Sequence, residues 1–76
     1  MQIESKNVGQ NLRRLRRQKE VRVVDLAAVL GVTRQHIYAL EAGRRALTLK
    51  RVAQLVNFLR VDISELIGKN GKRRAS

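Results

Sequence analysis

The stretch DLAAVLGVTRQHIYALEAGRR, residues 25–45, contains two short amphipathic segments joined by Gly31-Val32-Thr33. Gly31 can end the first segment, because glycine tolerates the left-handed backbone that follows many helices. Thr33 is a good N-cap for the second segment. The residues expected to lock the two segments together are small or apolar: Leu26, Ala27, Leu30, Val32, Ile37 and Leu40. The stretch therefore predicts two helices, over about 23–30 and 33–42, joined by a tight turn.

Apolar residues continue at helical spacing on both sides of this stretch. Upstream, the stripe of Val8, Leu12 and Leu15 predicts a helix over residues 6–19. Downstream, Thr48 is an N-cap for a helix with a predicted buried face of Leu49, Val52, Ala53, Val56 and Leu59. Asp62 and Glu65 have the spacing of a capping box, which predicts a last short helix ending at Gly68. The sequence thus predicts a compact all-α domain of five helices over residues 6–68.

Length and composition agree with one small basic domain. The chain has 76 residues, of which 17 are Lys or Arg and 6 are Asp or Glu, so its net charge is +11. Apolar residues make up 43% of the chain, enough for a folded core, whereas cysteine and proline are absent. We expect a flexible N-terminus over residues 1–5 and a disordered basic tail over residues 69–76. No signal peptide and no apolar run of about 20 residues is present, which favours a cytoplasmic protein without a membrane partner.

The sequence resembles the lambda-repressor/Cro family of helix-turn-helix domains, also called the XRE family, from about Val8 to Ile67. Besides residues 25–45, the segments GQNLRRLRRQKEV and LTLKRVAQLVNFLRVDISELI carry this resemblance. It implies that the third helix enters the major groove of DNA and contacts bases. The residues in the matching positions are Thr33, Arg34, Gln35, Tyr38 and Ala39. Arg34 and Gln35 are the best candidates, because Arg pairs with guanine and Gln with adenine through two hydrogen bonds. The alternative is that both are ordinary solvated residues of a first helical turn.

The resemblance also implies contacts with DNA phosphates and a structural ion pair. The candidate phosphate contacts are Arg22, Val23, His36, Arg44 and Arg45. Val23 departs from the family, which commonly has Gln there, so only its backbone N–H could bind phosphate. Arg16 and Glu41 match a pair that bridges the first and third helices in the family. Glu41 is the only acid between Asp25 and Asp62, and pairing with Arg16 would keep it from repelling phosphate.

The C-terminal part of the predicted domain has more apolar residues than a two-turn helix can bury in so small a domain. These residues are Phe58, Leu59, Val61, Ile63, Leu66 and Ile67. They either complete the core or form, as the resemblance implies, the interface of a symmetric homodimer. A dimer would place two recognition helices roughly 34 Å apart, one turn of DNA, on a palindromic site.

The predicted function is therefore a sequence-specific regulator of transcription that binds double-stranded DNA, either a repressor or a controller protein. One histidine, no cysteine and six scattered acids give no catalytic pair and no metal-ligand spacing. We expect no enzyme, no metal, no cofactor and no small-molecule effector. Two alternatives are a sequence-neutral nucleic-acid packing protein and an antitoxin-type autorepressor with a protein partner. A basic amphipathic helix on an anionic membrane or acidic partner is a further alternative, although residues 6–19 lack Trp and Phe.

Overall fold

The computed structural model describes residues 5–68, which form five α-helices and no β-strand. The helices are α1 (Ser5–Gln18), α2 (Val23–Leu30), α3 (Arg34–Glu41), α4 (Leu49–Leu59) and α5 (Ile63–Ile67). This confirms the predicted five-helix all-α fold, with small shifts at the helix ends. None of these helices has both the length and the apolar character needed to cross a membrane.

The predicted flexible ends fall almost entirely outside the described residues. Residues 1–4 and 69–76 lie beyond them. Ser5 is the exception, because it is the first residue of α1 and was expected to belong to a flexible N-terminus. The helix therefore starts one residue earlier than the sequence pattern indicated.

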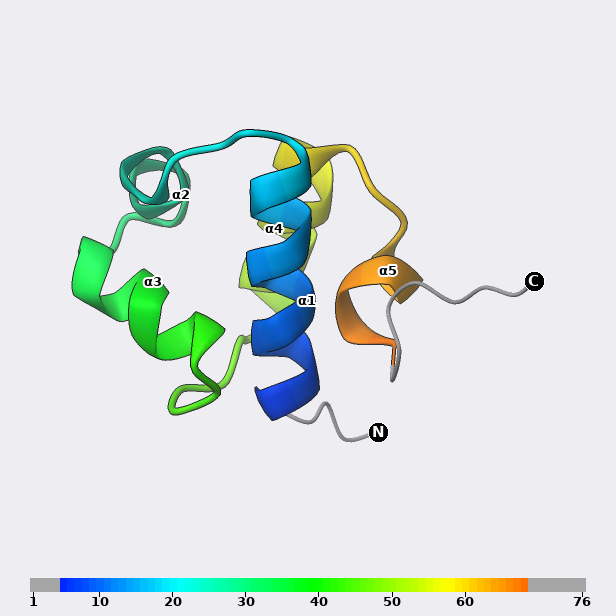
Figure 1. Ribbon diagram of the computed structural model, residues 1–76, viewed down its shortest axis with the longest axis horizontal. Coiled ribbons are helices and arrows are strands. Elements are labelled where there is room, and N and C mark those ends of the chain that lie inside the picture. The colour runs from blue at the N-terminus through cyan, green and yellow to red at the C-terminus, as the bar shows by residue number, and fades with distance from the viewer. Residues whose placement is uncertain (1–4, 69–76) are drawn as a thin grey trace.

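The helices surround one core (Figure 1). α1 packs on α3 and α5, α2 packs on α3 and α4, and α4 also packs on α5. In the view of Figure 1, α2 and α3 lie on one side of α1 and α5 lies on the other. The helix-turn-helix pair is thus held at one side of the molecule, and the C-terminal helix lies on the opposite side of α1.

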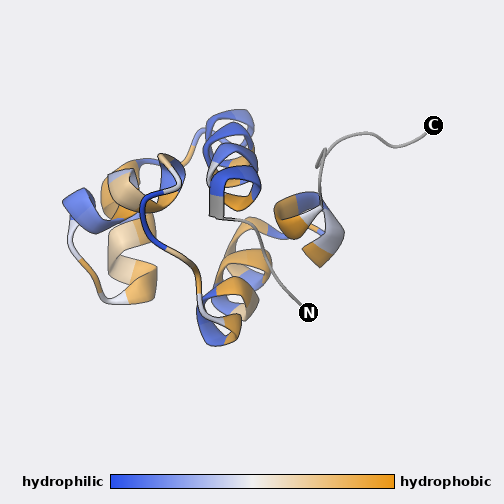
Figure 2. Ribbon diagram, turned by 90° about the horizontal axis from the view of Figure 1, so that it is seen from below, coloured by the Kyte–Doolittle hydropathy of each residue, from blue (hydrophilic) through white to orange (hydrophobic). Residues whose placement is uncertain are grey.

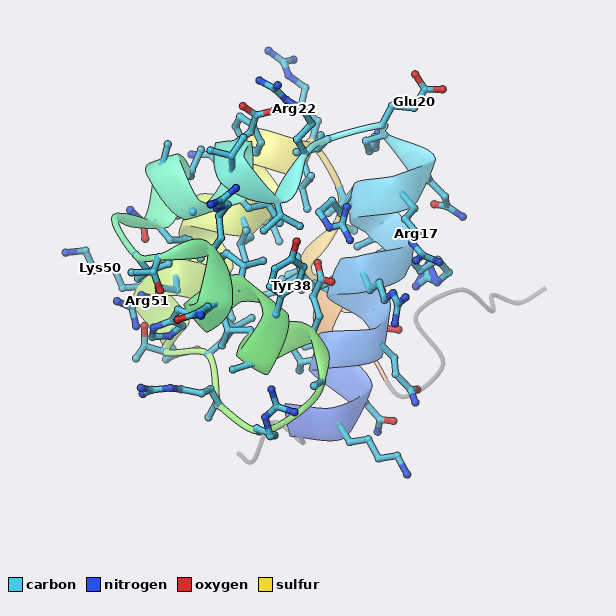
Figure 3. All side chains as sticks on the ribbon, turned by 60° about the vertical axis from the view of Figure 1, so that its left-hand side comes forward. Arg17, Glu20, Arg22, Tyr38, Lys50 and Arg51 are labelled. Carbon is cyan, nitrogen blue, oxygen red and sulfur yellow. The ribbon has the colours of Figure 1, made fainter. Side chains whose placement is uncertain are left out.

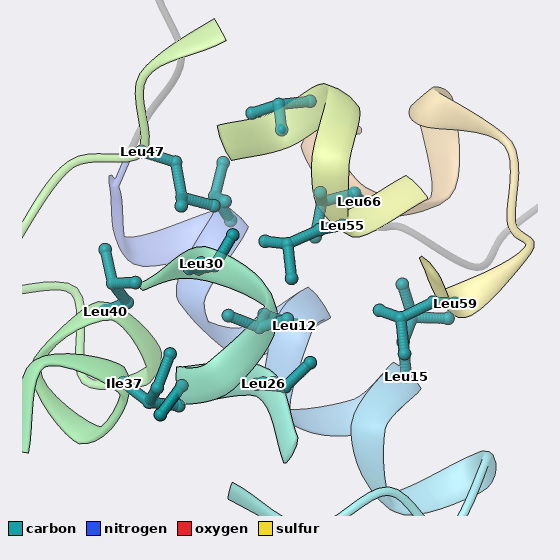
Figure 4. Packing of buried hydrophobic residues seen from close by; sticks show 13 residues of the cluster. Leu12, Leu15, Leu26, Leu30, Ile37, Leu40, Leu47, Leu55, Leu59 and Leu66 are labelled. Atoms are coloured by element: carbon teal, nitrogen blue, oxygen red, sulfur yellow. The ribbon is translucent and has the colours of Figure 1, made fainter. Parts of the chain in front are cut away.

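Aliphatic side chains fill the core (Figure 4). Its buried members are Val8, Leu12, Leu15, Leu26, Ala27, Leu30, Ile37, Leu40, Leu47, Val52, Leu55, Leu59 and Leu66. α1 is mostly hydrophilic outside its inward stripe (Figure 2). One expectation was wrong, because Leu49 is 73% exposed and Ala53 is exposed, while Leu55 is buried. Leu49 is the first residue of α4, and the core begins one turn later at Val52.

The predicted caps form at the helix-turn-helix. Gly31 has φ +70°, and the N–H groups of Gly31 and Val32 donate to carbonyls in the last turn of α2. Thr33 Oγ1 accepts a hydrogen bond from the His36 N–H at 3.1 Å. The connection between α1 and α2 is less regular, because Glu20 has φ +56° without being glycine. There the Asp25 carboxylate accepts a hydrogen bond from the Arg22 N–H at 3.4 Å and so caps α2.

Asn11 fastens α5 to α1, a role that the sequence analysis missed. Its side-chain Nδ2 donates to the carbonyls of Leu66 at 2.7 Å and Gly68 at 2.8 Å. Arg14 Nη2 donates in turn to Asn11 Oδ1 at 3.2 Å. Carbonyls at the end of a helix have no partner within the helix, so a side chain that reaches them fixes the helix end. Asn11 therefore helps to hold the end of α5 against α1.

Gly9 lies where α1 crosses the end of α3. A Cβ atom at this position would lie 2.4 Å from the Leu40 carbonyl oxygen and 2.6 Å from the Glu41 carbonyl oxygen. Both are backbone atoms of a packed helix, so they cannot swing aside as a flexible side chain would. The missing side chain of Gly9 is therefore what lets the two backbones approach each other.

We predict that Gly9→Ala lowers the free energy of unfolding by about 3 kcal/mol, because the methyl group would force α1 and α3 apart. Helix propensity alone would change stability in the opposite direction, by about 1 kcal/mol in favour of alanine. Urea denaturation shows whether Gly9→Ala lowers or raises the free energy of unfolding. The control is Gln10→Ala at the exposed neighbouring position, which should shift stability by no more than about 0.5 kcal/mol. A Gly9→Ala protein as stable as this control would contradict the close crossing.

Candidate nucleic-acid interface

The outer face of α3 carries the residues predicted to contact bases. Arg34, Gln35 and Tyr38 are exposed, as is the N-cap Thr33, and Ala39 is half-buried. Ile37, Leu40 and Glu41 are on the inward face and are buried. This division follows from helical geometry, because residues three and four positions apart share a face. The five predicted residues are thus brought together on one continuous surface of α3.

An ion pair joins the end of α3 to α1. Arg16 Nε lies 2.6 Å from Glu41 Oε2, and Arg16 Nη2 donates to Glu41 Oε1 at 3.2 Å. The Arg16 and Glu41 side chains are only 14% and 6% exposed. The hydrogen bond with Glu41 raises the pKa of Arg16 above its ordinary value, although burial opposes this. Arg16 Nη1 also donates to the Val21 carbonyl at 3.3 Å, so one guanidinium connects α1, the α1–α2 loop and α3.

Three of the predicted phosphate contacts lie on α3 or directly after it. Arg44 and Arg45 are exposed in the loop after α3, and His36 is half-buried. Desolvation, followed by the nearby charges of Arg45 and Arg51, lowers the pKa of His36 below its usual 6.5. His36 is therefore mainly neutral at pH 7, and a neutral imidazole can still donate one N–H to a phosphate.

The start of α2 offers little to a phosphate. The Val23 side chain is half-buried and apolar, and cannot donate a hydrogen bond. Arg22 is exposed, but its Nε lies 3.4 Å from Asp25 Oδ2 in a solvent-exposed ion pair. The structure brings these two predicted phosphate contacts together with an acid at the same helix end. The positive charge of Arg22 is consequently offset in part by the Asp25 carboxylate.

Further basic residues, which the sequence analysis missed, flank α3. Lys50 and Arg51 lie on the first turn of α4, and Figure 3 shows them on one side of α3. On the other side, toward α1, a hollow of about 400 Å³ adjoins Tyr38. Its lining residues are Arg13, Arg16, Arg17, Val23, Tyr38, Glu41 and Ala42. No local sequence signal identifies Lys50, Arg51, Arg13 and Arg17 as neighbours of α3, because they lie on α4 and α1 and approach α3 only in the folded structure.

The structure divides the predicted dimer-interface residues into three groups, which are buried, exposed and partly buried. Leu59 and Leu66 are 2% and 0% exposed, so they belong to the core and present no surface to a second copy. Assigning these two residues to an interface was wrong, because their side chains point into the core of the same copy. Phe58 and Ile63 are 42% and 49% exposed. Two further members of the set, Val61 and Ile67, are partly buried against the core.

Comparisons with known proteins agree with this architecture. A family model described as Helix-turn-helix matches residues 12–66. The crystal structure of the restriction-modification controller protein C.AhdI from Aeromonas hydrophila is similar with a TM-score of 0.72 and 31% identity, covering 82% of this chain and 94% of that chain. The clp gene regulator ClgR from C. glutamicum shares the fold with a TM-score of 0.79 at 21% identity, covering 92% and 91% of the two chains. No curated protein sequence matches the chain significantly.

We predict that Arg16→Met lowers the free energy of unfolding by about 3 kcal/mol, because it leaves the buried Glu41 carboxylate without its partner. Adding Glu41→Leu should restore much of this loss, since no charge then remains buried. Urea denaturation of the single and the double variant at pH 7 measures how much of the lost stability Glu41→Leu restores. The control is Arg22→Met, which breaks the exposed pair with Asp25 and should cost at most about 1 kcal/mol. Equal losses for Arg16→Met and Arg22→Met would contradict the special role of the buried pair.

Proposed function

Because this chain belongs to the XRE-type helix-turn-helix family of DNA-binding transcription regulators, we propose that it binds a palindromic DNA site specifically, as a homodimer. α3 lies in the major groove, and Arg34 and Gln35 read base edges. The observation that carries this proposal is the exposed face of α3, which presents polar side chains on a helix fixed to α1 by a buried ion pair.

The side chains on α3 suit base recognition better than simple charge attraction. Arg34 and Gln35 are exposed in the first turn, where a helix in the major groove comes closest to base edges. Gln carries no charge and gains nothing from phosphate attraction, but its amide can pair with adenine N6 and N7. A packing protein driven by charge alone would have no use for this residue at this position. The surface thus favours a sequence-specific regulator over the sequence-neutral alternative.

Phosphate contacts from the loop after α3 and from the start of α4 complete the proposed interface. Arg44 and Arg45 lie in the loop after α3, and Lys50 and Arg51 lie on the first turn of α4. Contacts to phosphates position a protein on the duplex without reading its sequence. We assign these cations to affinity and register, and the residues of α3 to specificity. The likeness to the restriction-modification controller protein supports a regulator of the controller type.

The proposed dimer uses the exposed apolar residues next to α5. Phe58 and Ile63 are large and about half exposed, and Val61 lies between them in sequence. Large exposed apolar side chains can mark a protein–protein interaction site. A two-fold axis near this surface would place the two α3 helices on one side of a duplex, as a palindrome requires.

We predict that selection from random duplexes enriches one palindromic motif. On the selected duplex, Arg34→Ala or Gln35→Ala should relax the preference at particular base pairs, by roughly 1–3 kcal/mol for each lost pairing. Arg44→Ala and Arg45→Ala are the matched controls, because they should weaken all duplexes alike and reduce the salt dependence. Recovery of no motif would refute specific recognition, and a uniform loss of affinity in Arg34→Ala would show that Arg34 binds phosphate instead.

We predict further that the double variant Phe58→Ser/Ile63→Ser is a folded monomer. Both side chains are substantially exposed in one copy, so their loss should affect association more than folding. Sedimentation equilibrium measures the association constant, and circular dichroism checks the helices. Leu49→Ser is the matched control, because Leu49 is exposed and apolar but lies at the far end of α4. If this control dissociates the protein and the double variant does not, the interface lies at the start of α4.

A further inference from the structure

The hollow between α1 and α3 joins the proposed base-contact surface. Residues from three helices line it. α1 contributes Arg13, Arg16 and Arg17, and α2 contributes its first residue. α3 contributes Tyr38 and the residues at its C-terminal end. Tyr38 is 53% exposed on the outer face of α3. Figure 3 shows it between α3 and α1, with Arg17 across from it on α1. The hollow therefore opens beside the side chains that are proposed to face the bases.

The arginines of the hollow differ in whether their charge is neutralised. Arg16 is held by Glu41 through two hydrogen bonds, so this pair contributes little net charge. Arg13 and Arg17 are exposed, and neither forms an ion pair with a carboxylate of residues 5–68. They lie four residues apart, which places both on the same face of α1. The hollow consequently has two guanidinium groups available to bind an anion.

The dimensions of DNA suggest which anion this is. An α-helix with its side chains is roughly 10–12 Å across, and the major groove is roughly 12 Å wide. A helix lying in the groove therefore has a row of phosphates along each flank. Lys50 and Arg51 lie on one flank of α3, and the hollow with Arg13 and Arg17 lies on the other.

We propose that Arg13 and Arg17 form a phosphate clamp in this hollow, in which their guanidinium groups bind phosphodiester oxygens of the strand beside α3. Guanidinium groups suit this role, because their N–H donors match the spacing of phosphate oxygens. The clamp supplies from α1 the side-chain donors that Val23 lacks at the start of α2. This proposal rests on the proposed DNA-binding function, and it assigns the phosphate contacts on the α1 side of the interface to Arg13 and Arg17.

The test is the salt dependence of binding by Arg13→Gln/Arg17→Gln, measured on the duplex selected by the wild-type protein. Each phosphate contact contributes a slope of about 0.9 to log affinity against log salt. The variant should therefore lose about tenfold less affinity than the wild type between about 50 and 200 mM salt. Its base preference should stay that of the wild type, because phosphate contacts do not read sequence.

A control of equal net charge is Lys6→Gln/Lys19→Gln. Lys6 and Lys19 are exposed, do not line the hollow, and form no ion pair with a carboxylate of residues 5–68. Thermal melting checks that both double variants fold. The control should keep most of the wild-type salt slope. If the two double variants have the same slope, charge alone explains the effect and the clamp is refuted.

Neutral methylphosphonate linkages, placed one at a time along the selected duplex, locate the contact. At the phosphate bound by the clamp, the substitution should weaken the wild-type protein about tenfold or more and leave Arg13→Gln/Arg17→Gln nearly unaffected. The absence of any such position would overturn the proposal. If the wild type selects no motif, the proposed specific function fails, but the comparison of salt slopes still judges the clamp on any duplex that the protein binds.

Discussion

The crossing of α1 over the last turn of α3 sets the position of the α3 residues that are proposed to read bases. α3 has eight residues, too few for a stable isolated helix in water, so its orientation comes from its contacts. Gly9 lets the backbones approach because it has no side chain at the crossing. Arg16 then reaches Glu41 and fixes the helix end with two hydrogen bonds. Ile37 and Leu40 anchor the inner face in the core.

Helix boundaries could be predicted from the sequence because local chemistry determines them. Gly31 and Thr33 act within one turn of their own position, and the structure shows both in the expected roles. The buried face of α4 depends instead on which side meets α2 and α5. Leu59 was expected to be buried and is buried, but both Leu55 and the pair Leu49 and Ala53 are compatible with helical periodicity, so the pattern alone could not select Leu55. Asn11 was missed because its partners are backbone carbonyls more than fifty residues away.

The same distinction applies to the candidate site. Five base-contact candidates could be named because the resemblance to the XRE family assigns base contacts to the helix that follows the turn, and that helix is short. Arg13, Arg17 and Arg51 belong to other helices and reach the neighbourhood of α3 only through tertiary packing. Apolar composition likewise suggested an interface but could not show that Leu59 and Leu66 point inward. Long-range packing, rather than residue type, decides these assignments.

The net charge of +11 overstates the positive charge that is free to attract DNA. Arg16 is neutralised by Glu41, and Arg22 shares the Asp25 carboxylate. The cations without such partners on both flanks of α3 would bind phosphates and make affinity sensitive to salt. Base recognition in the proposed complex depends on Arg34 and Gln35, which occupy a different part of the surface. Salt should therefore change how tightly the protein binds without changing which sequence it prefers, because affinity and specificity are assigned to separate side chains.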